Sequence, residues 1–271
     1  ADFMARAAHG LANDLLTASL LANVSPVLLI PAMNDRMWAN VQTTRNVAHL
    51  RELGYQVVDP DAGPLAVGEG MGPGRMPEPE EILSHIARLL ENREQFEGKR
   101  IVVTAGATRE AIDPVRFISN YSTGKMGVAI AEAAWRRGAD VTLITGHIEV
   151  PVPPAVNRIS ATSVTEMRDA VASALVGADA LIMAAAPADF RPSSVASQKM
   201  KKTAGSVPTI DLTQTEDILQ STIDARKAGA VIVGFALETE NLAKNGADKL
   251  AKKALDMVVA NSAVDPGSGF G

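Results

Sequence analysis

The sequence predicts an α/β protein built from two doubly wound parallel-sheet domains, and three observations carry this prediction. Short apolar runs alternate along the chain with stretches of helical periodicity. Such runs are typical of strands that are buried on both faces, as they are in parallel sheets. The charged segment 91–100, ENREQFEGKR, lacks apolar periodicity and separates two alternations of this kind. We therefore expect one domain at 1–95 and a second domain at 96–271.

The first domain is expected to begin with a helix and then to alternate. Its elements are a helix at 3–21, a strand at 27–31, a helix at 41–53, a strand at 56–58 and a helix at 79–92. A segment rich in glycine and proline, 59–77, is expected to form a loop before the last helix. The alternation of strands and helices indicates a parallel sheet.

The second domain shows the same alternation over a longer stretch. Strands are expected at 101–103, 141–144, 180–183, 231–235 and 257–260, and helices at 127–137, 164–175, 216–228 and 242–255. Right-handed crossovers should join the strands. Ligands of doubly wound sheets bind beyond the carboxyl ends of the strands. The loops after Val103, Met183 and Phe235 are therefore expected to converge on one site.

Composition excludes several classes of function. The net charge is −5, from 26 basic and 31 acidic residues that are interspersed, so we expect no nucleic-acid partner. The chain has no cysteine and its four histidines lack metal-ligand spacing, so we expect no metal held by protein ligands and a reducing, cytoplasmic location. Polar residues and Pro26 interrupt the apolar run 15–33, so no membrane span is expected. Because both ends of the chain look like cuts, residues that complete a site are expected to lie beyond them.

The loop between Thr104 and Gly124 is far longer than packing requires. Ordinary connections between a strand and a helix in such units take about 2 to 6 residues, and a longer loop usually holds a ligand. The loop matches neither standard phosphate fingerprint: Ser119 stands where a P-loop needs glycine, and Gly106 is not followed by the glycines of a dinucleotide fingerprint.

Two further features of this loop bear on ligand binding. Ser122 or Thr123 is expected to cap the helix that enters at Gly124, which would leave backbone donors for an anion. The alternative is a capped helix with no ligand. Asn120 adds a side chain that is both donor and acceptor.

The segment after Met183, AAAPADFRPSSVASQKMKK, follows a buried strand and combines small and charged residues. The alanines would allow a planar ligand close to the backbone, and Asp189 could accept a hydrogen bond from an exocyclic amino group. Its lysines, Lys199, Lys201 and Lys202, could fold over phosphates or could simply form a solvated face. Lys249 and Lys253 stand four residues apart on an expected helix, where they could meet a polyphosphate together or be ordinary surface lysines.

The segment PAMNDRMW, 31–38, follows an expected strand of the first domain. On residue type alone we interpret it as a cap and core motif, in which Asn34 or Asp35 turns the chain and Met33, Met37 and Trp38 pack inward.

Taken together, these motifs resemble the bifunctional bacterial family of phosphopantothenoylcysteine decarboxylases and phosphopantothenate-cysteine ligases of coenzyme A synthesis. The resemblance covers essentially the whole chain. AHGLANDLL, PAMNDRMW and GPGRM are similar to the carboxyl part of the decarboxylase, and TAGATREAIDPVRFISNYSTGKMG, AAPADF, KMKK and GFALETEN are similar to the ligase. It implies a partial flavodoxin-like flavoprotein domain at 1–95 and a Rossmann-like ligase domain at 96–271.

The ligase resemblance implies a two-step synthesis of an amide. The carboxylate of 4'-phosphopantothenate would attack the α-phosphate of CTP, with Mg²⁺ accompanying the triphosphate, and the amine of L-cysteine would then displace CMP. In such chemistry a protein mainly positions substrates and stabilises charge. The resemblance assigns the acyl group to Asn120, transfer to cysteine to Lys199, and the cytosine to Asp189. The remaining CTP contacts that it implies are Met183, Ala184, Ala185, Thr215, Asp217, Phe235, Lys249 and Lys253.

The decarboxylase resemblance implies an FMN cofactor and substrate binding by Asn34. The family's catalytic histidine would lie upstream of Ala1, and Val67 stands near the place of the family's proton-donating cysteine. Because valine cannot donate a proton, we expect flavin and substrate binding here rather than full turnover.

The resemblance also implies a homo-oligomer, in which ligase domains form dimers and decarboxylase domains form trimers. One alternative is a non-catalytic flavin- or nucleotide-binding scaffold, which Asn120 and Lys199 argue against. A nicotinamide-dependent reductase is a third interpretation, which the missing glycine fingerprint disfavours.

Overall fold

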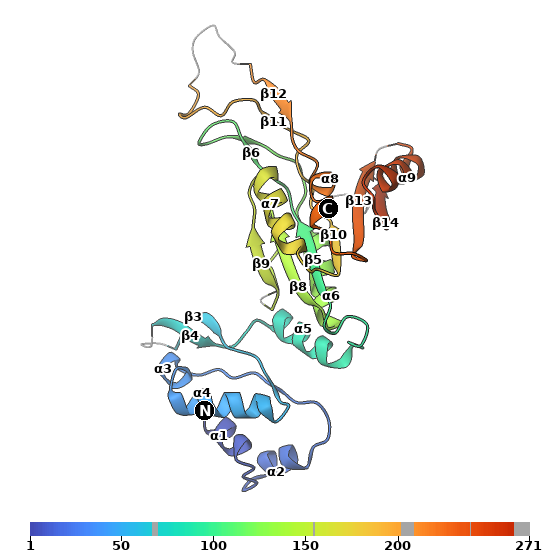
Figure 1. The fold of residues 1–271 in the computed structure, drawn as a ribbon. Helices are drawn as coiled ribbons and strands as arrows, with labels where there is room; N and C mark the ends of the chain where they lie inside the picture. The colour runs from blue at the N-terminus through green and yellow to red at the C-terminus, as the bar shows by residue number, and fades with distance from the viewer. Residues whose placement is uncertain (67–69, 154, 202–208, 239, 263–271) are drawn as a thin grey trace. The chain divides into compact units, whose positions relative to one another are not determined.

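The computed structural model describes residues 1–66, 70–153, 155–201, 209–238 and 240–262. The chain divides into two compact units, 1–91 (unit 1) and 92–271 (unit 2). Figure 1 shows the elements of both units along the chain.

Unit 1 contains five helices and two small sheets within its described residues. Its elements are α1 (Asp2–Ala8), α2 (Leu15–Ala22), β1 (Leu28–Leu29), α3 (Asp35–Trp38), α4 (Val41–Glu52), β2 (Gln56–Val57), β3 (Asp61–Pro64), β4 (Met71–Arg75) and α5 (Pro79–Leu90). The strands β1 and β2 pair in parallel, as the alternation predicts. The core lies between α1, α4 and β2, where Met4, Val47 and Leu50 are buried.

Two expectations for unit 1 are wrong. The single helix expected at 3–21 is two helices, because Gly10 adopts a left-handed φ of 65° and Asp14 begins a new helix with a capping box to Thr17. The loop expected at 59–77 contains the antiparallel pair β3 and β4, in which glycine and proline supply no periodic apolar signal.

Unit 2 is built around a six-stranded sheet in which all neighbouring strands pair in parallel. The strand order is β14-β13-β10-β5-β8-β9. The strands are β5 (Arg100–Ala105), β8 (Asp140–Thr145), β9 (Asn157–Ser160), β10 (Ala180–Met183), β13 (Val231–Glu238) and β14 (Met257–Ser262). The five expected strands are all present, which confirms the α/β fold class. The edge strand β9, NRIS, was missed because it contains a single large apolar residue.

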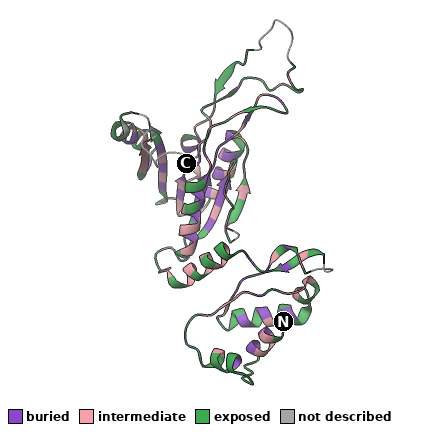
Figure 2. Ribbon diagram, turned by 180° about the vertical axis from the view of Figure 1, so that it is seen from behind, coloured by how far each residue is buried: buried purple, intermediate pink, exposed green. Residues whose placement is uncertain are grey.

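Helices cover both faces of this sheet. The helices of unit 2 are α6 (Lys125–Arg136), α7 (Val164–Leu175), α8 (Ile218–Ser221) and α9 (Leu242–Lys252). Along β5, Val102 packs into a cluster with α7 and α8, whereas Ile101 and Val103 pack into a second cluster with α6. Figure 2 shows that the residues of the central strands are largely buried. This arrangement is the doubly wound sheet that the sequence predicts.

The helix expected at 216–228 is wrong in length. The α-helix α8 ends at Ser221 and is followed by a 3-10 turn, Ile223–Ala225. Thr222, between the two, is buried and donates its hydroxyl to the carbonyl of Ile218 at 2.6 Å. A hydroxyl bonded back to the preceding turn competes with a regular helix.

Two long loops of unit 2 carry small antiparallel ladders that the sequence analysis treated as loop. The loop after β5 contains β6 (Glu110–Ala111) and β7 (Phe117–Ile118). The segment after β10 contains β11 (Phe190–Pro192), which pairs with β12 (Leu212–Gln214). Figure 1 shows β6 near β11, and the backbone N–H of Ala196 donates to the carbonyl of Ile112 at 3.0 Å. The two loops therefore run beside each other.

Candidate functional site

The strands β5 and β10 end nearly level with each other, whereas their neighbour β13 runs on past this level to Glu238. In the parallel register Met183 of β10 pairs with Thr104 of β5 on one side and with Gly234 of β13 on the other. The loops that follow these strands therefore begin at the same edge of the sheet, where doubly wound folds bind ligands.

Gly106 begins the loop after β5 in a conformation that glycine alone adopts easily. Its φ is 82°, and an added Cβ would lie 2.1 Å from the carbonyl oxygen of His147. Next to it, Ala107 and His147 exchange two backbone hydrogen bonds, and the N–H of Ala186 donates to the carbonyl of Gly106 at 2.9 Å. The loops after β5, β8 and β10 are thus tied into one structure at this point.

Asn120 joins the long loop to the loop after β10. Its Nδ2 donates to the carbonyl of Ala186 at 2.7 Å, and its Oδ1 accepts from the N–H of Ser122 at 3.0 Å. An amide side chain has two N–H groups and two lone pairs, so these bonds leave one of each for a ligand. The side chain is half-buried and is held in one orientation at the carboxyl edge of the sheet.

Met183, Ala184 and Ala185 lie where β10 ends. Thr104 Oγ1 donates to the sulfur of Met183 at 3.2 Å and accepts from the N–H of Ala185 at 3.0 Å. Thr104 is fully buried, and its hydroxyl fixes the alanine backbone against β5. The small side chains leave this backbone close to the neighbouring loops.

Asp189 and Thr215 stand at the base of the β11–β12 ladder and contact each other. The N–H of Thr215 donates to the carbonyl of Asp189 at 3.0 Å, and its hydroxyl donates to the carbonyl of Ala188 at 2.6 Å. Asp189 itself is exposed. The structure therefore brings the candidate cytosine acceptor next to the segment that leads into α8.

Lys199 is exposed and precedes a residue that is firmly held. The backbone N–H of Met200 donates to Asp113 Oδ2 at 3.1 Å, and its carbonyl accepts from Arg116 Nη2 at 2.9 Å. The Asp113 side chain is 0 % exposed and pairs with Arg116. The hydrogen bonds from Arg116 outweigh desolvation and, with the N–H groups of Val115, Arg116 and Met200, hold the pKa of Asp113 well below its usual range.

The segment that carries Lys199 is thus anchored on the long loop. Lys201 is exposed. Lys202 lies outside the described residues.

Lys249 and Lys253 both reach protein groups beyond α9. Lys249 Nζ donates to the carbonyl of Phe235 in β13, and Lys253 Nζ lies 2.7 Å from Asp217 Oδ2. Asp217 is the N-cap of α8 and accepts from the N–H of Leu219 at 3.0 Å. Burial opposes ionisation of Asp217, but the contact with Lys253 and the backbone donors prevail and lower its pKa. The two lysines therefore connect α9 to the middle of β13 and to the start of α8.

The expected cap of α6 is wrong. Gly124 is the N-cap, with a left-handed φ of 78°, and an added Cβ would lie 2.4 Å from Ile148 Cγ2. The N–H of Ser122 is bound to Asn120, and the carbonyl of Thr123 accepts from Glu149. In the part of the chain that the structure describes, no side-chain oxygen caps α6. The tight approach to Ile148 selects glycine where a serine or threonine cap was expected.

In unit 1, Asn34 caps α3 by accepting from the N–H of Arg36 at 2.9 Å. Met33 and Trp38 pack against the core of unit 1, as the cap and core interpretation predicts. Met37 is 47 % exposed, so the expectation that it packs inward is wrong. The role of Asn34 in binding the decarboxylase substrate stays a prediction. Val67, near the place of the family's cysteine, lies outside the described residues.

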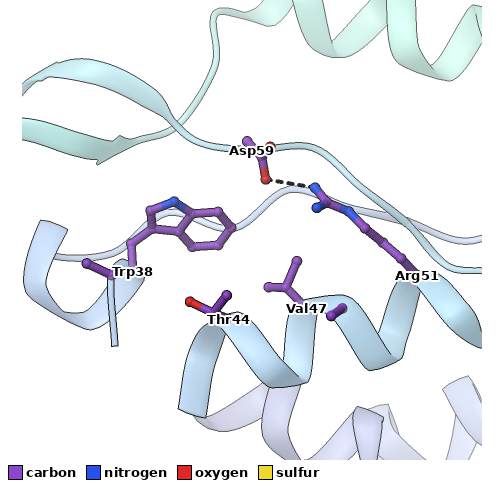
Figure 3. Close-up of a pocket in the computed structure, with 7 residues that line it drawn as sticks. Trp38, Thr44, Val47, Arg51 and Asp59 are labelled. Atoms are coloured by element: carbon purple, nitrogen blue, oxygen red, sulfur yellow. Dashed lines mark hydrogen bonds and ion pairs between the residues drawn. The ribbon is translucent and has the colours of Figure 1, made fainter. Parts of the chain in front are cut away.

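A cavity of about 250 Å³ in unit 1 was not foreseen (Figure 3). At the edge of this cavity, Arg51 Nη2 donates to Asp59 Oδ1 at 2.7 Å and to the carbonyl of Val57 at 2.9 Å. Its lining residues are Trp38, Ala39, Thr44, Val47, Ala48, Arg51 and Asp59. Because Arg51 lies on a helix and Asp59 follows a strand, no local spacing reveals the pair.

Other structural residues of unit 2 also escaped sequence reasoning. Asp113 and Arg116 form an ion pair, and their opposite charges three residues apart were a signal for it. Thr108 is fully buried and its Oγ1 accepts from the N–H of Ala188 at 2.9 Å. Arg226 links α8 to the end of α9 without any motif in its sequence neighbourhood.

Neither a metal-binding cluster nor a membrane-spanning helix is found among the described residues. They contain no group of three or more histidine, aspartate or glutamate side chains that could hold a metal ion. None of their helices combines the length and apolar character that crossing a membrane requires.

Two family models match the chain in sequence. Residues 96–271 match the DNA/pantothenate metabolism flavoprotein C-terminal domain, and residues 1–91 match the family described as Flavoprotein.

Similar proteins carry one name. The coenzyme A biosynthesis bifunctional protein CoaBC of Vibrio parahaemolyticus is 44% identical over 271 residues, which are 100% of this chain and 67% of that protein. The protein of that name in Mycobacterium tuberculosis is 46% identical over 284 residues, covering 100% of this chain and 68% of its own length.

Solved structures agree with this similarity. The crystal structure of the C-terminal domain of a coenzyme A biosynthesis bifunctional protein CoaBC is 38% identical, with a TM-score of 0.53, and the match covers 62% of this chain and 78% of that one. A DNA/pantothenate metabolism flavoprotein from Streptococcus pneumoniae is 25% identical, with a TM-score of 0.52, covering 61% of this chain and 82% of that one. The chain therefore belongs to the family of bifunctional coenzyme A biosynthesis proteins and is an enzyme of that biosynthesis.

Proposed function

We propose that unit 2 is a CTP-dependent phosphopantothenate-cysteine ligase. One observation carries the proposal furthest: the Asn120 amide is bonded to Ala186, directly after the two alanines that follow β10. The residue proposed for the acyl group and the backbone proposed for cytosine thus belong to one hydrogen-bonded structure. Activation of a carboxylate by CTP requires these two substrates to meet.

The chemistry needs positioned donors and no protein nucleophile. A carboxylate oxygen of 4'-phosphopantothenate attacks the α-phosphorus of CTP, and pyrophosphate leaves with the electrons of the broken P–O bond. The amine of L-cysteine then attacks the acyl carbon, CMP leaves, and the amine loses its proton to solvent. Asn120 has one N–H left to orient the acyl oxygen, and the ammonium of Lys199 would stabilise negative charge in the transfer step.

Mg²⁺ fits this site as an ion carried by the triphosphate. The described residues hold no cluster of three carboxylates or histidines for it. Mg²⁺ is commonly bound by substrate phosphates and one or two carboxylates, and it keeps several waters. We therefore propose that phosphate oxygens of CTP supply most of its ligands.

Product formation tests the ligase. The purified chain, given 4'-phosphopantothenate, L-cysteine, CTP and Mg²⁺, is expected to form the cysteine amide and CMP, measured by liquid chromatography and mass spectrometry. Lys199→Gln removes the ammonium and is expected to slow product formation about 10²-fold, the size of effect typical of a lost charge-stabilising group. Lys99→Gln is the matched control, because Lys99 is exposed and precedes β5 at the opposite edge of the sheet. Wild-type protein that forms no amide would contradict the proposal.

For unit 1 we propose flavin binding, with FMN as the cofactor, and binding of the phosphopantothenoylcysteine substrate through Asn34. The match of residues 1–91 to the Flavoprotein family supports this proposal. The cavity beside Trp38 does not fit the phosphate of FMN, because Arg51 already donates to Asp59 and to Val57. No decarboxylation step is derived for this chain. Titration of the apoprotein with FMN, followed by quenching of flavin fluorescence, tests binding, and unchanged fluorescence would contradict it.

We also propose that the protein is a homo-oligomer, with dimers formed through the ligase unit and trimers through the flavoprotein unit. For the dimer, support comes from the long loop of unit 2, where Tyr121 is 90% exposed and Val115 is 58% exposed. Exposed apolar side chains mark an interface where they gather into one contiguous patch. A monomeric mass in sedimentation equilibrium would contradict the proposal.

A further inference from the structure

Arg226 joins two elements that carry the proposed contacts to the triphosphate. It directly follows the 3-10 turn Ile223–Ala225. Its Nη2 donates to the carbonyl of Leu219 in α8 at 2.5 Å, and its Nη1 donates to the carbonyl of Ala254 at 2.8 Å. Both nitrogens also lie near the carbonyl of Lys253, at 3.4 and 3.5 Å. One guanidinium thus spans α8 and the end of α9.

The carbonyls that Arg226 contacts beyond α8 belong to Lys253 and Ala254, the two residues that follow the last residue of α9. Lys253 is the C-cap of α9, and Ala254 follows in a left-handed conformation with a φ of 48°. The last carbonyls of a helix have no partner within it and carry partial negative charge. The planar fork of arginine suits this position, because its separate N–H groups can reach two carbonyls at once, whereas lysine offers a point charge.

A second tie joins the same two elements through side chains. Lys253 Nζ lies 2.7 Å from Asp217 Oδ2, and Asp217 is the N-cap of α8. Arg226 therefore holds the backbone of Lys253, and Asp217 holds its ammonium. Lys249, one turn earlier on α9, is bound to the carbonyl of Phe235.

The positive charge of Arg226 is only partly compensated by its surroundings, which favours a polyanion nearby. Burial lowers the pKa of Arg226, and the nearby carboxylates of Asp256 and Asp217 only partly counter this. Its Nε has no hydrogen-bond partner among the described residues. A partly buried cation that carboxylates compensate only in part is a costly arrangement. With Lys249 and Lys253 it adds a third positive charge to the junction of α8 and α9.

We infer that Arg226 is a positioning residue for the β- and γ-phosphates of the nucleotide. It fixes the end of α9 on α8, so that Lys253 can exchange its contact with Asp217 for a contact with phosphate without moving the backbone. This inference rests on the proposed function, because it takes the ligand to be CTP.

Calorimetric titration with CTP and with CMP tests the role of Arg226. Arg226→Met is expected to weaken CTP binding about tenfold, which corresponds to about 1.4 kcal/mol, because Lys253 loses the contacts that hold its backbone on α8. CMP lacks the two outer phosphates, so its Kd should change less than about twofold. Arg226→Lys keeps the charge but cannot bridge both carbonyls. Its Kd for CTP should therefore lie between those of Arg226→Met and wild type.

The control and the double variant separate positioning from a general loss of structure. Arg137→Met is the matched control, because Arg137 also donates to a helix carbonyl, that of Ala133, at the end of α6. If Arg226 acts through Lys253, Arg226→Met should weaken CTP binding much less in a Lys253→Met background than in wild type. Equal losses for CMP and CTP, unchanged CTP binding, or additive losses in the double variant would each overturn the inference. Wild-type protein that does not bind CTP would instead overturn the proposed function.

Discussion

Asn120 is the residue on which the proposed chemistry depends most. Sequence reasoning could identify it as a donor and acceptor in an oversized loop, but it could not show that Ala186 fixes its orientation. That bond connects residues 66 positions apart, and no local pattern encodes it. The structure shows that this hydrogen bond to Ala186 fixes Asn120 at the edge of the sheet.

Asn120→Asp is expected to slow amide formation about 10²-fold and to leave the Kd of CTP within a few-fold of wild type. The substitution replaces the Nδ2 donor with an oxygen that faces the carbonyl of Ala186, and loss of one donor at a reacting group typically has this size of effect. Steady-state rates with all three substrates measure it. Asn40→Asp is the control, because Asn40 caps α4 in unit 1 and aspartate caps equally well. A rate within twofold of wild type would show that Asn120 is only structural.

Asp113 should make stability depend on pH. Its pKa is depressed in the folded state, so its contribution is fully present above the ordinary aspartate pKa of about 3.9 and is lost as the pH falls through the folded pKa. Asp113→Asn should therefore lower the urea midpoint at pH 7, and the difference from wild type should narrow at pH 3. A difference that is the same at both pH values would contradict this assignment.

Among the helices and strands of unit 2, the sequence predicted the buried strands correctly. It did not predict the helix ends that are set by a single tertiary contact. The buried strands were found because apolar runs identify them, and β9 was missed because it is a polar edge. Helix α6 begins at a glycine because Ile148 leaves no room for a side chain, and α8 ends early because Thr222 bonds backwards. Such outcomes depend on tertiary neighbours that a local pattern does not contain.

Gly127 shows how closely α6 approaches the sheet. A Cβ at this position would lie 2.6 Å from both Ala105 Cβ and the carbonyl oxygen of Thr104. Gly127→Ala is expected to lower the free energy of unfolding by about 1–3 kcal/mol, as overpacking does. Urea denaturation measures this change. Gly246→Ala on α9 is the matched control, since its Cβ would meet only ordinary contacts at 3.8 Å. It should be neutral or stabilising by up to about 1 kcal/mol, and equal losses for both variants would contradict the packing argument.

At the scale of the whole molecule, the sequence predicted the fold class, but it could not give the strand order of the large sheet. The order β14-β13-β10-β5-β8-β9 places β10 between β5 and β13, and this is why the loops with Asn120 and Asp189 leave one edge, beside the strand β13 that carries Phe235. The contacts of Arg226 and the pair of Arg51 with Asp59 were beyond sequence reasoning for the same reason. Each joins separate elements whose proximity only the fold determines.

The two units have separate cores, so a change in one is expected to leave the stability of the other unaltered. The chain has two tryptophans, Trp38 in unit 1 and Trp135 in α6. In a Trp38→Phe background the only tryptophan is Trp135, so its fluorescence reports the unfolding of unit 2 in urea. In this background Gly127→Ala should lower the urea midpoint. In a Trp135→Phe background the fluorescence of Trp38 reports the unfolding of unit 1, and Gly127→Ala should leave its urea midpoint unchanged. Equal shifts of both transitions would contradict independent cores.

Release of pyrophosphate from CTP, with cysteine withheld, distinguishes a CTP-dependent ligase from a protein that only binds nucleotide. Release is expected only when 4'-phosphopantothenate is present, in an amount close to that of the enzyme, because the acyl-cytidylate stays bound until an amine attacks it. Addition of L-cysteine should convert this burst into steady turnover. Absence of pyrophosphate with both substrates present, or release that does not require 4'-phosphopantothenate, would contradict the assignment of unit 2 as a CTP-dependent ligase.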